Sequence, residues 1–220
     1  MPERVDESPW QRDVLIGDAL TLHATEIPPR RCVRLMRPVR PALVVGSAQS
    51  MDGIDVSYCS AHGVDVARRR SGGGAVFVHP DSTLWIDVVV PRGDQLWLDD
   101  VGRSMIWLGE AWVGALVEWG VSDLEVHRGA LARNDWSSLI CFAAVGTGEV
   151  VDAHGHKVVG ISQRRTRDAA RFQCVVNFAW DVDQLAAMMP ALAADRPRLA
   201  GLAAVVPPID PTSFANRLAR

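Results

Sequence analysis

Lysine is nearly absent from this sequence of 220 residues: twenty-two arginines are present beside a single lysine, Lys157. Such a bias indicates that arginine has replaced lysine wherever the two are interchangeable. They are not interchangeable where chemistry needs a compact, strongly hydrated charge on a flexible stem instead of a planar fork. Lys157 is therefore a candidate functional residue. The alternative is that one lysine survived by chance on a hairpin.

Cysteine is also scarce, and the four that occur, at positions 32, 59, 141 and 174, form no CxxC pair and no short His/Cys ligand spacing. This pattern favours neither a zinc site nor a disulfide framework, so we expect reduced thiols and no metal. No apolar run approaches membrane-spanning length, and the first residues are polar and acidic. A net charge of −3 gives no overall positive field to hold nucleic acid or an anionic membrane. We expect a soluble, cytoplasmic protein.

Internal repeats, low-complexity tracts and Gly/Ser linkers are missing as well, so residues 1–220 are expected to form a single domain. Short apolar runs between turn signals predict many strands, at about 32–36, 42–47, 64–68, 74–79, 83–90, 122–127, 138–144 and 171–178, with a hairpin of arms 148–152 and 157–163. Helices are predicted over about 13–27, 55–62 and 99–120, from about 183, and after 210. Adjacent strands with few intervening helices predict an α+β fold of mixed, mainly antiparallel sheets packed with helices.

A glycine-rich segment, Arg69-Arg70-Ser71-Gly72-Gly73-Gly74, lies between two of the predicted strands. Consecutive glycines cost backbone entropy, so they indicate positive φ angles or a backbone that approaches a ligand closely. Their amide groups can form an anion-binding concavity, and the arginines can add bidentate recognition of phosphate or carboxylate. The segment is not a P-loop, because no Gly-Lys-Ser/Thr follows. The alternative is a flexible turn with a solvated basic flank.

A second motif contains the lone lysine: Gly155-His156-Lys157-Val158-Val159-Gly160-Ile161-Ser162-Gln163-Arg164-Arg165. Together with the glycine-rich segment and the strand Pro41-Ala42-Leu43-Val44-Val45-Gly46, it resembles the lipoate-protein ligase A superfamily of lipoate ligases, octanoyltransferases and lipoyl amidotransferases. The resemblance covers roughly residues 13–185. It implies a catalytic domain of the biotin/lipoate ligase type. No C-terminal accessory domain would fit in the residues that remain.

The resemblance implies that Lys157 contacts the acyl carbonyl and that Gly72–Gly74, with Arg69, Arg70, Ser71 and Gly160, bind the substrate. A nonpolar acyl tail needs an apolar slot, and the reacting carbonyl needs a cation aimed at the developing oxyanion. The slot walls are expected among nearby apolar side chains, each of which is also a good core residue: Val76, Val78, Trp85 and Val159.

Cys141, in a predicted strand before the Lys157 hairpin, resembles the cysteine that forms an acyl thioester in the octanoyltransferase and amidotransferase branches. The alternative is a buried, structural cysteine. Cys174 is a weaker candidate, because strand alternation can point it into the core. His79 lies one residue beyond the position where this superfamily often has a histidine, and such an offset reverses its facing on a strand. His154 and His156 flank a turn and are expected to be solvated.

We therefore expect an enzyme that transfers an octanoyl or lipoyl group through Cys141 to a lysine of a lipoyl domain, with Lys157 polarising the carbonyl. The donor would be an acyl carrier protein, and the acceptor a 2-oxoacid dehydrogenase subunit or glycine-cleavage H protein. One alternative is an ATP-dependent lipoate ligase in which Arg69, Arg70 and Lys157 hold phosphate. The other is a lipoyl-binding module without catalysis.

Overall fold

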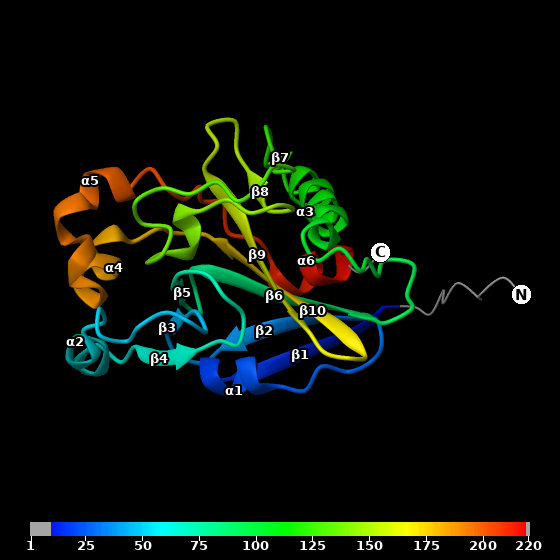
Figure 1. Cartoon of the computed structure of the whole chain (residues 1–220), viewed down its shortest axis with the longest axis horizontal. Coiled ribbons are helices and arrows are strands. Elements are labelled where there is room, and N and C mark those ends of the chain that lie inside the picture. The colour runs from blue at the N-terminus through cyan, green and yellow to red at the C-terminus, as the bar shows by residue number, and fades with distance from the viewer. Residues whose placement is uncertain (1–9, 219–220) are drawn as a thin grey trace, which may run out of the picture.

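A seven-stranded sheet forms the centre of the part of the chain that this computed structural model describes, residues 10–218 (Figure 1). Its order is β1-β2-β6-β10-β9-β8-β7, and every neighbouring pair is antiparallel except β1 and β2. The strands are β1 (Gln11–Gly17), β2 (Cys32–Pro38), β6 (Thr83–Pro91), β7 (Glu125–Val126), β8 (Val150–Val151), β9 (Lys157–Arg165) and β10 (Ala169–Asn177).

A smaller, three-stranded sheet lies beside it, in the order β4-β3-β5, with β3 parallel to β4 and antiparallel to β5. Its strands are β3 (Ala42–Val45), β4 (Asp65–Arg68) and β5 (Val76–Val78). The helices are α1 (Ala19–Ala24), α2 (Val56–Ala61), α3 (Ile106–Glu118), α4 (Val182–Met188), α5 (Arg196–Leu199) and α6 (Pro211–Leu218), with 3₁₀ turns at η1 (Arg103–Met105), η2 (Cys141–Ala143) and η3 (Pro190–Asp195). The predicted α+β class with mainly antiparallel sheets is confirmed.

Two apolar cores cover the two faces of the large sheet. The central strands β6 and β10 are buried along their whole length, which suits their valine-rich runs. On one face α3 and α6 pack through Trp112, Leu116 and Phe214. On the other face, Trp85 and other side chains of the large sheet pack against the small sheet, α1 and α4. The candidate site lies on this second face, between the two sheets.

The helix predicted over 13–27 is wrong in its first half, because residues 11–17 form the edge strand β1 and only 19–24 are helical. Along β1 the side chains alternate in exposure, and Val14 and Ile16 point to solvent. The apolar run fits either a strand or a helix by composition, and parallel pairing with β2 decides it. Asp18 caps the helix by accepting a hydrogen bond from the Thr21 backbone N–H.

The strand predicted over 138–144 is also wrong. Its only ladder contact in the described chain is an isolated bridge between Ile140 and Ala75, after which residues 141–143 turn as η2. The Ala143 N–H donates back to the Ile140 carbonyl, so the chain bends instead of extending. The predicted helix over 99–120 forms only from about residue 103, and the predicted strand over 122–127 is limited to Glu125–Val126. The hairpin turning at residues 152–156 is confirmed.

Candidate active site

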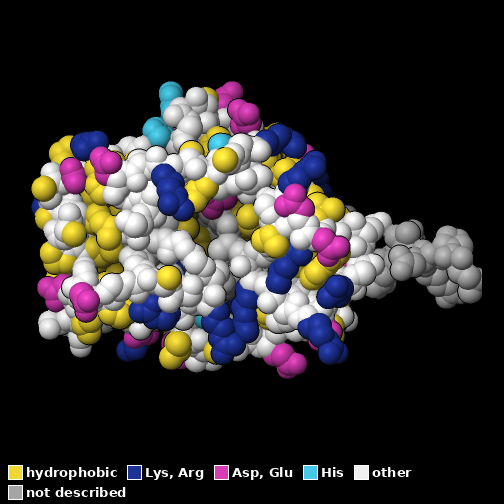
Figure 2. Space-filling view, viewed as in Figure 1, with side chains coloured by type: hydrophobic (Ala, Val, Ile, Leu, Met, Phe, Trp, Pro, Cys, Tyr) yellow, Lys and Arg dark blue, Asp and Glu magenta, His cyan; other side chains and the backbone are white. Residues whose placement is uncertain are grey.

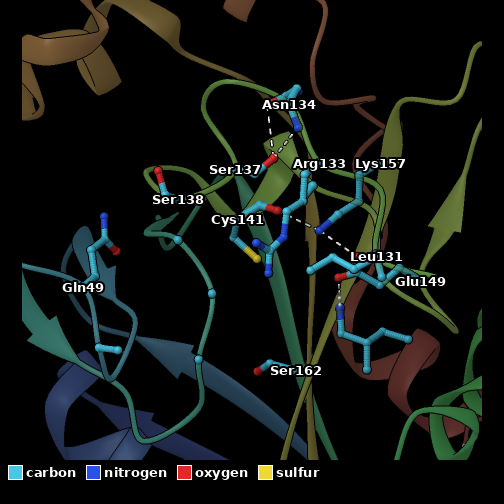
Figure 3. Close-up of a pocket in the computed structure, with 17 residues that line it drawn as sticks. Gln49, Leu131, Arg133, Asn134, Ser137, Ser138, Cys141, Glu149, Lys157 and Ser162 are labelled. Carbon is cyan, nitrogen blue, oxygen red and sulfur yellow. Dashed lines mark hydrogen bonds and ion pairs between the residues drawn. The ribbon is translucent and has the colours of Figure 1, made fainter.

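An open pocket of about 570 Å³ lies where three distant segments meet (Figure 3). The glycine-rich segment after β4 forms one side, the loop 131–149 forms a second side, and β9 contributes the third. Gly72, Gly73 and Gly74 line this pocket together with Cys141 and Lys157. The structure therefore brings together the two predicted catalytic residues and the three predicted glycines.

Lys157 is almost completely buried, with 2% of its surface exposed. Its Nζ lies 2.8 Å from Oε2 of Glu149 and donates to the Cys141 carbonyl oxygen at 2.7 Å. An ammonium group has three N–H donors. Two of them have acceptors here, so the third donor is not used.

Glu149 is a site residue that the sequence analysis missed. Its side chain is 7% exposed, and besides Lys157 it accepts hydrogen bonds from the Gly146 N–H at 2.6 Å and the Ile161 N–H at 3.0 Å. This carboxylate therefore fixes both the lysine and the start of the hairpin. The signal in the sequence is an acid inside a predicted buried arm, residues 148–152, where an unpaired charge would be costly.

Cys141 differs from the other cysteines in exposure. The four thiols are free, and Cys141 is half-buried at the pocket wall while Cys32, Cys59 and Cys174 are buried. Cys174 lies in the core against α3, where burial raises the pKa of its thiol. Only Cys141 is therefore placed to meet a ligand.

The glycine-rich segment is held by hydrogen bonds to the segment that carries Cys141. The Ala75 N–H donates to the Leu139 carbonyl at 2.7 Å, and the Cys141 N–H donates to the Ala75 carbonyl at 2.8 Å. Gly73 has a φ of +95°, which favours glycine. At Gly74 a Cβ would lie 2.6 Å from the Ile140 backbone nitrogen. These two glycines therefore allow a conformation and a close approach that place Cys141 beside the segment.

Arg69 also stabilises the glycine-rich segment. Its guanidinium is buried and donates to the carbonyl oxygens of Val44, Gly72 and Gly74 at 2.7–3.2 Å. In this arrangement Arg69 binds the protein backbone. Ser71, also buried, joins the segment to β9 through a 3.1 Å hydrogen bond between its Oγ and that of Ser162.

Gly74→Ala should destabilise the protein and disturb Cys141. The added methyl group meets backbone atoms of Leu139 and Ile140, which cannot turn aside as a side chain can. We expect a loss of about 1–3 kcal/mol in the free energy of unfolding, measured by urea denaturation, and a changed rate of Cys141 alkylation by iodoacetamide. Gly72→Ala is the matched control for stability, because a Cβ there meets nothing within 4 Å. Equal stability of the two variants would contradict this account.

A small cavity of about 30 Å³ adjoins the pocket next to Cys141. Its walls are mostly apolar and include Val76, Val78 and Trp85, three of the four predicted slot walls, together with Phe142, Val175 and Gly160. Arg69 also reaches it. Val159 does not, because it faces the opposite core against α3. Gly160 leaves room there: a Cβ would touch the Phe142 ring at 3.5 Å.

His23 and Gln173 form a polar end to this cavity, and the sequence analysis missed both. Gln173 Nε2 lies 2.9 Å from Nδ1 of His23, whose ring lies 4.5 Å from that of Trp85. Arg171 holds the end of α1 in place: it pairs with the buried Asp87 at 2.6 Å and donates to the carbonyl oxygens of Leu22, His23 and Thr25. Burial, with the charges of Arg171 and Arg69, lowers the pKa of His23 to about 3.

His23 should make the protein less stable as the pH falls. Its pKa is about 3 in the folded chain and 6.5 ordinarily, so between these values the unfolded chain binds the extra proton. The free energy of unfolding is therefore unaffected by this histidine above pH 6.5. Between pH 6.5 and pH 3 it falls by up to about 1.4 kcal/mol per pH unit. The free energy of unfolding, measured in urea from pH 7.5 to 4, should depend less steeply on pH for His23→Gln than for the wild type. The exposed His62, changed to Gln, is the control, and equal slopes for all three proteins would disprove the assignment.

Arg70, a predicted substrate-binding residue, lies apart from the pocket, and so do the histidines considered in the sequence analysis. Arg70 is exposed and lines a separate hollow with Arg164. His79 is half-buried, and its Nδ1 accepts from the Asp81 N–H. His154 and His156 lie at the hairpin turn, with His156 beside Asp152.

Within residues 10–218 no three His, Cys, Asp or Glu side chains gather as metal ligands would. None of the helices in that range is both long and apolar enough to cross a membrane.

Comparison with known proteins gives a consistent family assignment. Residues 16–220 match the family model described as lipoyl protein ligase A/B catalytic domain. The octanoyltransferase LipM of Clostridioides difficile is 27% identical over 144 residues, which are 65% of this chain and 52% of that protein. The match thus spans about half the length of this curated relative.

Solved structures share the fold. A Thermoplasma acidophilum protein with bound lipoic acid has a TM-score of 0.69 and 18% identity, covering 96% of this chain and 83% of that one. A bi-partite lipoate protein ligase studied with its E2 lipoyl domain, from the same organism, has a TM-score of 0.68 and 19% identity, covering 96% and 81%. At these identities the likeness concerns the fold.

Proposed function

This chain belongs to the lipoyl protein ligase A/B catalytic domain family, and we propose that it transfers an octanoyl or lipoyl group from a carrier thioester to a lysine of a lipoyl domain, through a thioester on Cys141. The observation that carries the proposal is the position of Cys141. It is the one half-exposed cysteine, and it lines a pocket that also contains Lys157 and the glycine-rich segment. The similarity to LipM, an octanoyltransferase, supports a transferase over a ligase.

In the first step the Cys141 sulfur attacks the carbonyl carbon of the donor thioester. A new C–S bond forms, the donor C–S bond breaks, and the donor thiol leaves with the proton that Cys141 gives up. Negative charge develops on the carbonyl oxygen during the attack. The free N–H of Lys157 stabilises that charge, because a cation held at a fixed position acts on a developing oxyanion without having to reorganise.

In the second step the amine of the acceptor lysine attacks the same carbonyl carbon. An amide bond forms, the bond to Cys141 breaks, and one amine proton replaces the acyl group on the sulfur. The acyl carbon occupies the same place in both steps, so the same N–H of Lys157 serves both. Glu149 keeps the ammonium group at that place in both steps.

The acyl tail would occupy the apolar cavity beyond Cys141. Val76, Val78, Trp85 and Phe142 provide the apolar walls that such a tail requires. The cavity of about 30 Å³ equals roughly the volume of one water molecule. An octanoyl tail therefore enters only when wall side chains turn aside.

Mass spectrometry tests the proposal. The purified protein, incubated with octanoyl carrier protein and without ATP, should gain one octanoyl group that hydroxylamine removes. Addition of a lipoyl domain should discharge it onto a lysine of that domain. If acylation of the lipoyl domain instead requires ATP and free acid, and no adduct forms, the ligase alternative holds and Arg69, Arg70 and Lys157 become the candidates for holding phosphate.

A further inference from the structure

A second hollow, of about 410 Å³, lies beside the acyl site and has no role in the steps above. It is formed by the segment after α1, by Arg70, and by Arg164 with the end of the β9–β10 hairpin. Ser71, which follows Arg70, is hydrogen-bonded to Ser162, and Ser162 lines both the main pocket and the apolar cavity. Arg164 lies two residues farther along β9, so its side chain is on the same face of the strand as that of Ser162.

The two arginines face this hollow without a partner. Across residues 10–218 neither the Arg70 nor the Arg164 guanidinium has an ion pair or hydrogen bond. Glu26 and Asp168 also line the hollow, yet neither forms an ion pair with either arginine. Arg164 is half-buried, so its charge is only partly solvated. An unpaired, half-buried guanidinium group such as that of Arg164 is uncommon, because it lacks compensation for its lost hydration.

Arg164 lies among like charges. Burial and the like charges of Arg70 and Arg171 lower the pKa of Arg164. The same excess of arginine acts on His23, whose pKa is lowered by burial and then by Arg171 and Arg69. The buried Asp87 pairs with Arg171. Figure 2 shows basic side chains gathered along the lower rim of the central hollow of the molecule. An anion bound between Arg70 and Arg164 would relieve the repulsion between their guanidinium groups.

We propose that Arg70 and Arg164 form a binding subsite for a phosphate group of the acyl donor, and that this phosphate is the one on a phosphopantetheine thioester arm. This inference rests on the proposed function. Guanidinium groups recognise phosphate through paired hydrogen bonds, which suits a pair of free arginines. The subsite would hold the donor arm while its thioester lies at Cys141.

Distance favours the thioester arm over an acyl-adenylate. Lys157 and Arg164 are seven residues apart on one strand, so their Cα atoms are about 23 Å apart. In an adenylate the phosphate is bonded directly to the acyl carbonyl, so it would lie at Lys157 and not at Arg164. A phosphate at the far end of a flexible arm can span such a distance.

The test compares donors with and without the phosphate. Single-turnover acylation of Cys141 is measured with octanoyl-4′-phosphopantetheine and with octanoyl-pantetheine. We expect the wild type to prefer the phosphorylated donor by about tenfold or more in kcat/KM, since hydrogen bonds to charged groups have that strength. Arg164→Gln should bring the ratio close to one. Arg167→Gln, which changes a highly exposed arginine paired with Asp168 on the same hairpin, should keep the wild-type ratio.

Binding of unacylated 4′-phosphopantetheine and pantetheine, measured by calorimetry, gives the same comparison without a reaction. A preference that disappears in Arg164→Gln supports the subsite even if no acyl adduct forms, in which case the proposed function alone fails. An unchanged preference in both assays overturns the subsite. If only the KM for ATP rises in Arg164→Gln, with octanoate as the acid, the phosphate belongs to a nucleotide and the donor-arm assignment is overturned.

Discussion

Cys141→Ser should abolish the hydroxylamine-sensitive octanoyl adduct. A serine hydroxyl is a far weaker nucleophile than a thiolate when no base activates it, so neither half of the transfer can proceed at a useful rate. We expect the initial rate of lipoyl-domain acylation to fall by at least about 1,000-fold, as is typical when the nucleophile of a covalent mechanism is removed. Intact-protein mass spectrometry after incubation with octanoyl carrier protein measures the adduct directly.

Cys174→Ser is the matched control for this substitution. Cys174 is another free thiol, but it is buried in the core against α3 and lines none of the pockets near the site. This variant should form the adduct to the same extent as the wild type under conditions where it is folded. If Cys141→Ser still carries a thioester, or if lipoyl-domain acylation continues unchanged, Cys141 is only a wall of the pocket.

Lys157→Arg should lower acyl transfer by about 100- to 1,000-fold, the range observed when one oxyanion donor is removed. The guanidinium keeps the positive charge beside Glu149, so the buried carboxylate stays paired. It cannot keep the position of the third N–H, because the fork is planar and larger than an ammonium group. Steady-state rates with octanoyl carrier protein and a lipoyl domain measure the loss.

Stability and catalysis are separated by two further variants. Lys157→Met leaves Glu149 buried without its counter-charge, which costs about 3–5 kcal/mol in the free energy of unfolding. The double variant Lys157→Met with Glu149→Gln removes both charges and should recover much of that stability while remaining inactive. Near-normal turnover of either Lys157→Arg or the double variant would show that Lys157 has a structural role only.

Lys157 and the glycines could be predicted from the sequence because each is chemically unusual there. A single lysine among many arginines and three consecutive glycines are both costly or improbable unless a specific property is needed. The two motifs then carried the resemblance to the lipoate-protein ligase A superfamily, and the runs of adjacent strands predicted the α+β class. What these signals could not reveal is that Gly74 is required by the chain itself, through its approach to Ile140.

Glu149 and His23 were missed because their roles depend on partners far away in the sequence. The Glu149 carboxylate becomes a site residue only when the hairpin brings it to Lys157, and His23 becomes one only when Arg171 holds α1 over the sheet. The segments over 13–27 and 138–144 were misread for a similar reason. Their apolar runs suit strand or helix, and long-range pairing with β2 and with Ala75 decides the outcome.

The burial of Lys157 protects the protein from the reaction that it is proposed to catalyse. A chain that carries an acyl thioester and delivers it to amines is at risk of acylating its own lysines. Here the one lysine is enclosed and paired with Glu149, so its nitrogen is not available to attack the thioester. Guanidinium groups stay protonated in proteins and are poor nucleophiles by comparison. The arginines therefore supply the positive charges of this protein, and the activated acyl group meets no exposed lysine except that of the acceptor.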